Sequence, residues 1–174
     1  MTIAIRPAGA DHVAAIDALL RSCFPRGEEA DLVRNLCIAG DMVLVLAAID
    51  EDEGAVVGTV AFSRMAVEIG GRSIPAVALA PIAVASTHRH QGVAEALVHA
   101  GIEQLETAGI ILCFVLGDPG YYTRFGFAAD VASGFSSPYA GEYLMALPLQ
   151  GGLIPCGVRG NASHAAAFAM LSAK

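Results

Sequence analysis

Basic residues are scarce in this sequence. Its 174 residues hold 10 Lys and Arg against 17 Asp and Glu, which gives a formal net charge of −7. A surface of that sign repels nucleic acid and anionic membranes, so we expect neither as a partner. An anion that does bind must be attracted by a local arrangement of groups.

Long apolar runs are also absent, although 55% of the residues are hydrophobic and the mean hydropathy is +0.59. The richest stretches are residues 42–49, 75–85 and 109–117. Each is well below the ~18–20 apolar residues that span a bilayer. The beginning of the sequence lacks the basic and apolar regions of a secretory signal. We therefore expect a cytoplasmic protein, long enough for one domain with a large core.

Closely spaced metal ligands are missing as well. The four cysteines are scattered, with no C-x-x-C pair, so buried reduced thiols are expected. His88 and His90 alternate in a turn, and the other histidines lie far apart with no carboxylate at the spacing of zinc sites. We expect no metal. The sequence also lacks G-x-G-x-x-G and the P-loop motif, which disfavours dinucleotide-binding folds and P-loop NTPases.

What the sequence does contain is an alternation of strand-like and helical stretches, typical of an α/β (α+β) fold. Asp11 is a candidate N-cap of the first helix, Gly70-Gly71-Arg72 is a hairpin turn, and Gly109 is a candidate helix C′ residue. The expected strands cover residues 3–8, 42–49, 55–69, 73–85 and 110–117, and the expected helices cover 9–24, 28–37 and 92–108. Beyond them lie a short helical turn, residues 126–131 and 142–149, and a last strand–helix pair from Gly152 to Ala173.

With no internal repeat or linker, we expect a single domain over residues 1–174. We expect residues 150–174 to form a C-terminal strand–helix extension packed on it.

The most basic turn of the chain comes directly before the third helix. The first N–H groups of a helix lack intrahelical partners and carry partial positive charge, which suits an anion. Gly92 would let a phosphate approach the backbone, and Ala94 keeps the first turn slim. Arg89 adds a fork of donors suited to phosphate oxygens. A solvated loop before an ordinary helix is the alternative interpretation.

Two further features accompany this turn. Pro81 interrupts the apolar run from Val77 to Val84, and proline cannot donate to a strand ladder. It marks either an edge strand or a place where pairing with one neighbour opens to an amide-bearing ligand. After the next strand, Tyr121 and Tyr122 lie on a short helical turn that Gly126 ends before a strand starts at Phe127. A phenol there can reach a cleft, or two tyrosines can pack at a rim.

Together these motifs resemble a known family. R-x-x-G-x-A from Arg89 to Ala94, after a strand ending "IAV", and Y-x-x-x-G-F from Tyr122 to Phe127 are similar to the GNAT superfamily of N-acetyltransferases, in its YhbS-like bacterial branch. The resemblance covers residues 42–149 and implies a mixed, mostly antiparallel sheet with splayed central strands, flanked by helices.

The resemblance also implies the roles of particular residues. By this resemblance acetyl-CoA would be the cosubstrate, and its pantetheine arm would bond to the backbone of Ile82, Ala83 and Val84. Tyr122 would be the general acid. The amides that hold its pyrophosphate are those of Arg89, His90, Gln91, Gly92, Val93 and Ala94.

The implied chemistry is attack by an amine on the thioester in a ternary complex. Tyr122 would protonate the leaving sulfur or hydrogen-bond to it, and a strand amide such as that of Val84 would meet the oxyanion. The strand before the turn lacks the glutamate base of many GNAT enzymes. The candidates are Glu28, Glu29 and Glu68, by residue type only, or a water chain.

A non-catalytic acyl-CoA sensor or interaction module on the same fold is the alternative. The acceptor, an amine-bearing molecule, is not identified by the sequence, and a homodimer is left open.

Overall fold

The strands form a mixed sheet, as the sequence predicts. The computed structural model describes residues 2–152 and 160–171. Its strands are β1 (Ile3–Pro7), β2 (Met42–Asp50), β3 (Ala55–Ile69), β4 (Arg72–Val84), β5 (Leu112–Leu116), β6 (Phe135–Ser136), β7 (Leu144–Pro148) and β8 (Gly160–Ser163). The strand order is β1-β2-β3-β4-β5-β7, and β8 pairs with β3 and β6. The pairs β1–β2, β3–β8 and β5–β7 are antiparallel, whereas β4–β5 and β6–β8 are parallel.

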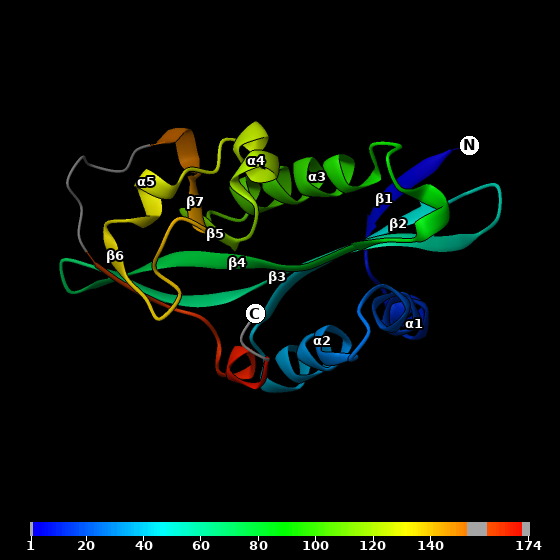
Figure 1. Cartoon of the computed structure of the whole chain (residues 1–174), viewed down its shortest axis with the longest axis horizontal. Helices are drawn as coiled ribbons and strands as arrows, with labels where there is room; N and C mark the ends of the chain where they lie inside the picture. Colours follow the sequence, from blue (N-terminus) through cyan, green and yellow to red (C-terminus); the bar gives the residue numbers. More distant parts are fainter. Residues whose placement is uncertain (1, 153–159, 172–174) are drawn as a thin grey trace. The chain divides into compact units, whose positions relative to one another are not determined.

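Helices connect these strands (Figure 1). The α-helices are α1 (Val13–Cys23), α2 (Glu28–Ala39), α3 (Val93–Thr107), α4 (Pro119–Tyr122) and α5 (Ala129–Ala132). The 3₁₀ turns are η1 (Ala10–His12), η2 (Ser86–His88), η3 (Thr123–Phe125), η4 (Gln150–Gly152) and η5 (Ala166–Met170). None of the helices in the part of the chain that is described is both long and apolar enough to cross a membrane. The cytoplasmic location stays a prediction.

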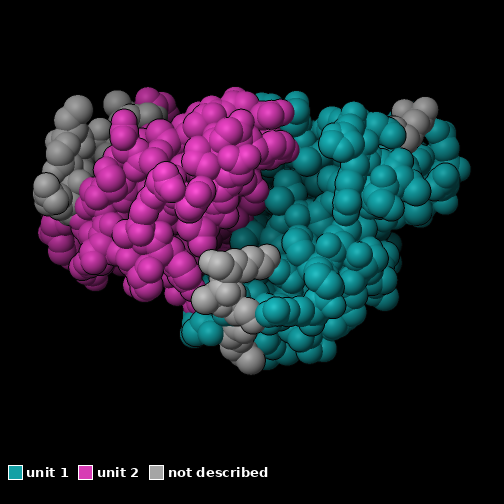
Figure 2. Space-filling model, viewed as in Figure 1, with its two compact units in different colours: residues 1–62, 80–101, 166–174 teal, residues 63–79, 102–165 magenta. Residues whose placement is uncertain are grey.

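The chain divides into two compact units, coloured separately in Figure 2. Unit 1 comprises residues 1–62, 80–101 and 166–174, and unit 2 comprises residues 63–79 and 102–165. The single domain over residues 1–174 remains a prediction.

Unit 1 is built as helices on both faces of its strands (Figure 1). On one face a buried cluster joins α1 and α2 to β2 and β4, and its members are Ile16, Leu20, Ala30, Ala47 and Ala83. On the other face Gly58 of β3 lies against α3, because a Cβ there would come within 3.0 Å of Val93 and 3.1 Å of Leu97. Side chains alternate across a strand, so neighbouring apolar residues serve opposite layers.

Unit 2 contains the strand that the sequence places at the centre of the sheet. β5 has four buried residues, Leu112 to Val115, and pairs on one side with β7 and on the other with β4. The β4–β5 register runs from Ala76↔Leu112 to Leu79↔Val115. Burial on both faces explains its nearly continuous apolar sequence.

Two turns predicted from glycine are confirmed. Gly70 and Gly71 have φ of 57° and 78°. Positive φ at both central residues is what a type I′ hairpin turn requires. At the end of α3, Gly109 has φ of 81°. The Ile110 amide donates to the Leu105 carbonyl at 3.0 Å and the Gly109 amide donates to Glu106 at 3.1 Å. This is the Schellman arrangement with glycine at C′.

Two local predictions are wrong. Asp11 is not the N-cap, because the first turn begins after Gly9, whose amide donates to His12 Nδ1 at 2.9 Å. Phe127 does not start a strand: only an isolated bridge, Ala128↔Ala146, precedes α5. The C-terminal segment contains β8 and the 3₁₀ turn η5, and the strand–helix extension over residues 150–174 stays a prediction. Of the segment from Gly152 to Ala173, residues 153–159, 172 and 173 lie outside the described part.

Candidate functional site

The segment between β4 and α3 adopts an unusual backbone. His90 has φ of 62° and Gly92 has φ of 81°, both in the left-handed region. A non-glycine residue rarely adopts that conformation, and such residues gather at ligand-binding turns. Left-handed residues in a turn direct successive amides toward one side, the arrangement of anion-binding nests.

Helix α3 begins directly after this segment. The first backbone hydrogen bond at its start runs from the Ala96 amide to the Gly92 carbonyl, at 3.0 Å. The amides of Gly92, Val93 and Ala94 precede that bond, at the positive end of a 15-residue helix. Apart from its chain neighbours, no atom of the described residues lies within 4 Å of the position of a Cβ on Gly92, so the backbone there is open to an approaching ligand. This backbone is compatible with the anion site that the sequence places at residues 89–94, and that site stays a prediction.

The Arg89 side chain lies differently from the expectation. Its Nε donates to the Val84 carbonyl at 3.1 Å, and its Nη2 lies 3.8 Å from the Cys23 sulfur. The Cys23 thiol also contacts the Val84 carbonyl, at 3.5 Å. The guanidinium therefore contacts the end of β4 through Nε and Cys23 through Nη2. Sequence reasoning missed Cys23, which lies 61 residues from Val84.

The end of β4 agrees with one of the two interpretations of Pro81. β4 lies between β3 and β5 in the strand order, so the edge-strand alternative is wrong. Within the described residues the ladder with β5 ends at Leu79, whereas β4 continues to Val84. Ile82 and Val84 are half-buried, and Ala83 belongs to the core cluster of unit 1.

Tyr122 lies at the end of α4, in unit 2. Asp118 caps this helix by accepting from the Gly120 amide at 2.9 Å. The Tyr122 ring packs against Gly117, where a Cβ would come 2.6 Å from Tyr122 Cε2, and edge-on against Phe127 at 5.9 Å between centroids. Burial raises the pKa of Tyr122 to about 12. The phenol is therefore protonated throughout the neutral range and available as a donor.

Tyr121 packs against Tyr122. Their rings contact edge-on at 5.0 Å, and the Arg124 guanidinium lies 4.5 Å from the Tyr121 ring centroid. The Tyr121 hydroxyl is buried. Tyr121 and Tyr122 therefore belong to one aromatic cluster.

The three candidate bases occupy positions with ordinary structural explanations. Glu28 and Glu29 lie in the first turn of α2, where a carboxylate offsets the helix dipole. Glu68 is exposed on β3 in unit 2, opposite Asn161 of β8. The structure supports none of them over the others as the base.

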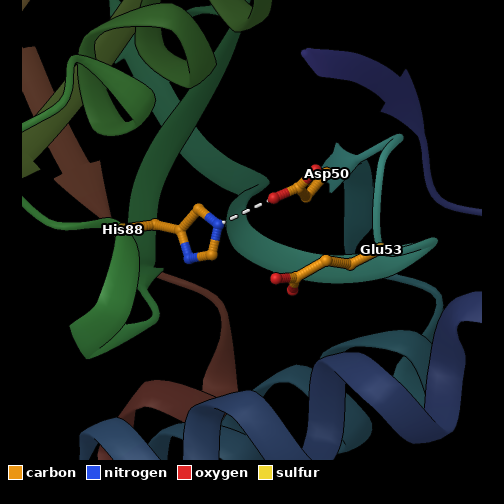
Figure 3. Close-up of side chains that lie close together, drawn as sticks. All are labelled: Asp50, Glu53 and His88. Carbon is orange, nitrogen blue, oxygen red and sulfur yellow. Dashed lines mark hydrogen bonds and ion pairs between the residues drawn. The ribbon is translucent and has the colours of Figure 1, made fainter. Parts of the chain in front are cut away.

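A further cluster in unit 1 was not foreseen. Asp50, Glu53 and His88 each place one potential ligand atom within 4.8 Å of the others (Figure 3). The sequence argument against a metal considered local spacing only, whereas His88 lies 38 residues from Asp50. The absence of a metal stays a prediction.

Comparison with known proteins decides the family. The model of the acetyltransferase (GNAT) domain matches residues 4–129, most of the chain. The chain belongs to the GNAT acetyltransferase family. The sequence-based resemblance is thereby confirmed, and GNAT proteins include the uncharacterized N-acetyltransferase YhbS of Escherichia coli K12, which is 46% identical over 112 residues. That match spans 64% of this chain and 65% of YhbS, just under two thirds of the relative's length.

Solved GNAT structures share the fold over nearly the whole chain. The YhbS structure from Escherichia coli, in complex with CoA, has a TM-score of 0.87 and 34% identity, and covers 98% of this chain and 93% of that one. A GNAT family acetyltransferase from Brucella melitensis, in complex with acetyl-CoA, has a TM-score of 0.77 and 28% identity, and covers 96% and 98%. These likenesses confirm the predicted mixed sheet with flanking helices.

Proposed function

We propose that this GNAT protein transfers an acetyl group from acetyl-CoA to a primary amine by direct attack in a ternary complex. The observation that carries the proposal is the segment from Arg89 to Ala94, whose left-handed residues and helix start offer amides to a pyrophosphate. Two relatives of the same fold were solved with CoA or acetyl-CoA, which supports the same ligand here. The amides of Arg89 to Ala94 would hold the pyrophosphate, and the backbone of Ile82, Ala83 and Val84 would bond the pantetheine arm.

The chemistry follows from the groups that the site offers. The amine nitrogen attacks the thioester carbonyl carbon, the C–S bond breaks, and its electron pair leaves on sulfur. The proton lost by the nitrogen passes to water or to a base. A strand amide such as that of Val84 would stabilise the oxyanion.

Tyr122 would act on the departing sulfur. Its pKa of about 12 makes it a weaker acid than a thiol, which titrates near ~8.5. Complete proton transfer from the phenol to the thiolate is therefore uphill. A hydrogen bond from the phenol to the sulfur strengthens as negative charge develops, which favours the transition state over bound substrate.

A sensor without acetyltransferase activity is the second candidate. One observation favours it: the segment of β4 before the turn, "AVALAPIAV", has no titratable side chain. In a sensor the residues that bind CoA would be retained and no amine would be acetylated. A homodimer is compatible with either function.

The test of the proposal is Tyr122→Phe, after a panel of small amines, peptides and protein lysines has identified an acceptor by thiol release. We expect acetyl-CoA affinity close to wild type and kcat lowered by about 10²-fold, because the ring remains and only the donor is lost. Tyr121→Phe is the matched control in the same aromatic cluster and should lower kcat only mildly.

Two results would contradict this assignment. Wild-type turnover in Tyr122→Phe would make Tyr122 a packing residue. Tight acetyl-CoA binding without acetylation of any amine in the panel would favour the sensor.

A further inference from the structure

A buried polar pair lies in unit 1, outside the proposed chemistry. Asp50 is 3% exposed and His88 is 7% exposed. His88 Nε2 and Asp50 Oδ2 are 3.0 Å apart, and the dashed line in Figure 3 marks this bond. The bond to His88 holds the pKa of Asp50 below its ordinary value. Polar groups this deeply buried are stable only when they are hydrogen-bonded, so each depends on the other.

Asp50 lies at the start of the turn that joins β2 to β3. Asp50 is the last residue of β2, and its Oδ1 accepts from the Asp52 amide at 3.0 Å. Its carbonyl accepts from the Gly54 amide at 2.7 Å. Asp50 thus bonds to both its own turn and His88.

The His88 side leads into the anion-binding segment. His88 is the last residue of η2, and its Nδ1 lies 2.7 Å from the Thr87 hydroxyl. Its amide donates to the Ala85 carbonyl at 2.9 Å. The next residue, Arg89, begins the segment that contains the left-handed residues His90 and Gly92.

A cation at the same place explains the geometry less well. Glu53 approaches the pair, but its side chain belongs to an exposed turn. Both ring nitrogens of His88 and both carboxylate oxygens of Asp50 already have protein partners at 2.7 to 3.0 Å. The pair is satisfied without a metal.

We propose that Asp50 and His88 are positioning residues for the coenzyme. His88 anchors the start of residues 89–94 to the β2–β3 turn, and this anchor keeps their amides ordered before CoA binds. An ordered site avoids the entropic cost of ordering the segment on binding, which increases affinity. This inference rests on the proposed binding of acetyl-CoA at residues 89–94.

The test measures acetyl-CoA affinity by calorimetry, well below the unfolding temperature of every variant. Asp50→Ala and His88→Ala should each raise the dissociation constant about tenfold, and the double variant should be no weaker than the worse single one. Asp50→Asn retains an acceptor oxygen and should restore most of the affinity. In the absence of ligand, hydrogen exchange of residues 89–94 should accelerate in Asp50→Ala.

Glu51→Ala is the matched control on the same turn. Glu51 forms an exposed ion pair with Arg6 at 2.8 Å, and exposed pairs contribute little to stability. This bond runs to β1 and not to residues 89–94. Its acetyl-CoA affinity should equal that of the wild type.

Three outcomes would overturn the inference, and a fourth would refute the proposed function. Unchanged affinity in Asp50→Ala, with only a lower unfolding temperature, would make the pair purely structural. Additive losses in the double variant would show that the two residues act separately. Loss of wild-type affinity in EDTA, restored by Zn²⁺, would replace the hydrogen bond with a metal. Absence of acetyl-CoA binding in the wild type would instead refute the proposed function.

Discussion

The hydroxyl of Tyr122 is the single group on which the proposed catalysis depends most. Its ring is held by Gly117, Tyr121 and Phe127, so its position follows from packing. The same burial raises its pKa to about 12. The same buried environment therefore fixes the position of the ring and raises the pKa of its hydroxyl. A hydroxyl with a raised pKa stays protonated and can donate a hydrogen bond.

The raised pKa predicts a specific loss of stability in alkali. The phenol of the unfolded chain titrates near ~10, so above that pH the unfolded state loses its proton while folded Tyr122 keeps it. The contribution of Tyr122 to the free energy of unfolding is fully present below the pKa of the unfolded chain, and it is lost as pH rises toward about 12. Tyr122→Phe lacks this loss. Thermal unfolding between pH 8 and 11 measures this. Above about pH 10 the melting temperature of the variant should rise relative to that of the wild type. A difference in melting temperature that is independent of pH would refute the raised pKa.

At the scale of elements, α3 provides a matched pair of glycines. Gly92 before its start and Gly109 after its end both have φ of 81°. In the described part of the chain, no atom beyond the two adjacent residues lies within 4 Å of a Cβ at either position. Alanine at either position adopts the same left-handed backbone, which costs roughly 1–2 kcal/mol. The two substitutions therefore carry the same strain, and only the one at Gly92 places a methyl group where the pyrophosphate is proposed to bind.

We predict that Gly92→Ala and Gly109→Ala lower the melting temperature by similar amounts. Acetyl-CoA affinity should fall about tenfold or more in Gly92→Ala and stay at the wild-type value in Gly109→Ala, since bound ligand and methyl compete for one space. Calorimetry on both variants measures this. Equal affinities would show that residues 89–94 are only the start of a helix.

At the scale of the whole molecule, acetyl-CoA should act as a stabilising ligand. A ligand at ~100 times its dissociation constant adds about 2.7 kcal/mol to folding, which corresponds to a rise of roughly 5–10 °C for a chain of this size. Differential scanning calorimetry with acetyl-CoA, and with AMP as a control that lacks the pyrophosphate, measures the shift. No shift with millimolar acetyl-CoA would contradict coenzyme binding.

The same scan also tests the predicted single domain. One transition that shifts as a whole is expected if units 1 and 2 unfold together. Two transitions, with only one raised by ligand, would show that the units fold independently.

Local chemistry in the sequence was sufficient for much of this protein. The turn at Gly70 and Gly71 and the start and end of α3, at Gly92 and Gly109, each depend on residues within a few positions of one another. Backbone conformation at glycine and the charge at a helix end are local properties, so the sequence could determine them. The order of motifs around them then indicated the family.

Only the tertiary structure decided which distant groups meet. Asp50 and His88 are separated by 38 residues, and Cys23 and Val84 by 61, so no spacing in the sequence links either pair. The edge-strand interpretation of Pro81 was excluded by strand order, and the pKa of Tyr122 is raised by burial in the folded chain. Strand order and burial depend on contacts between segments far apart in the chain, and these contacts form only when the chain folds.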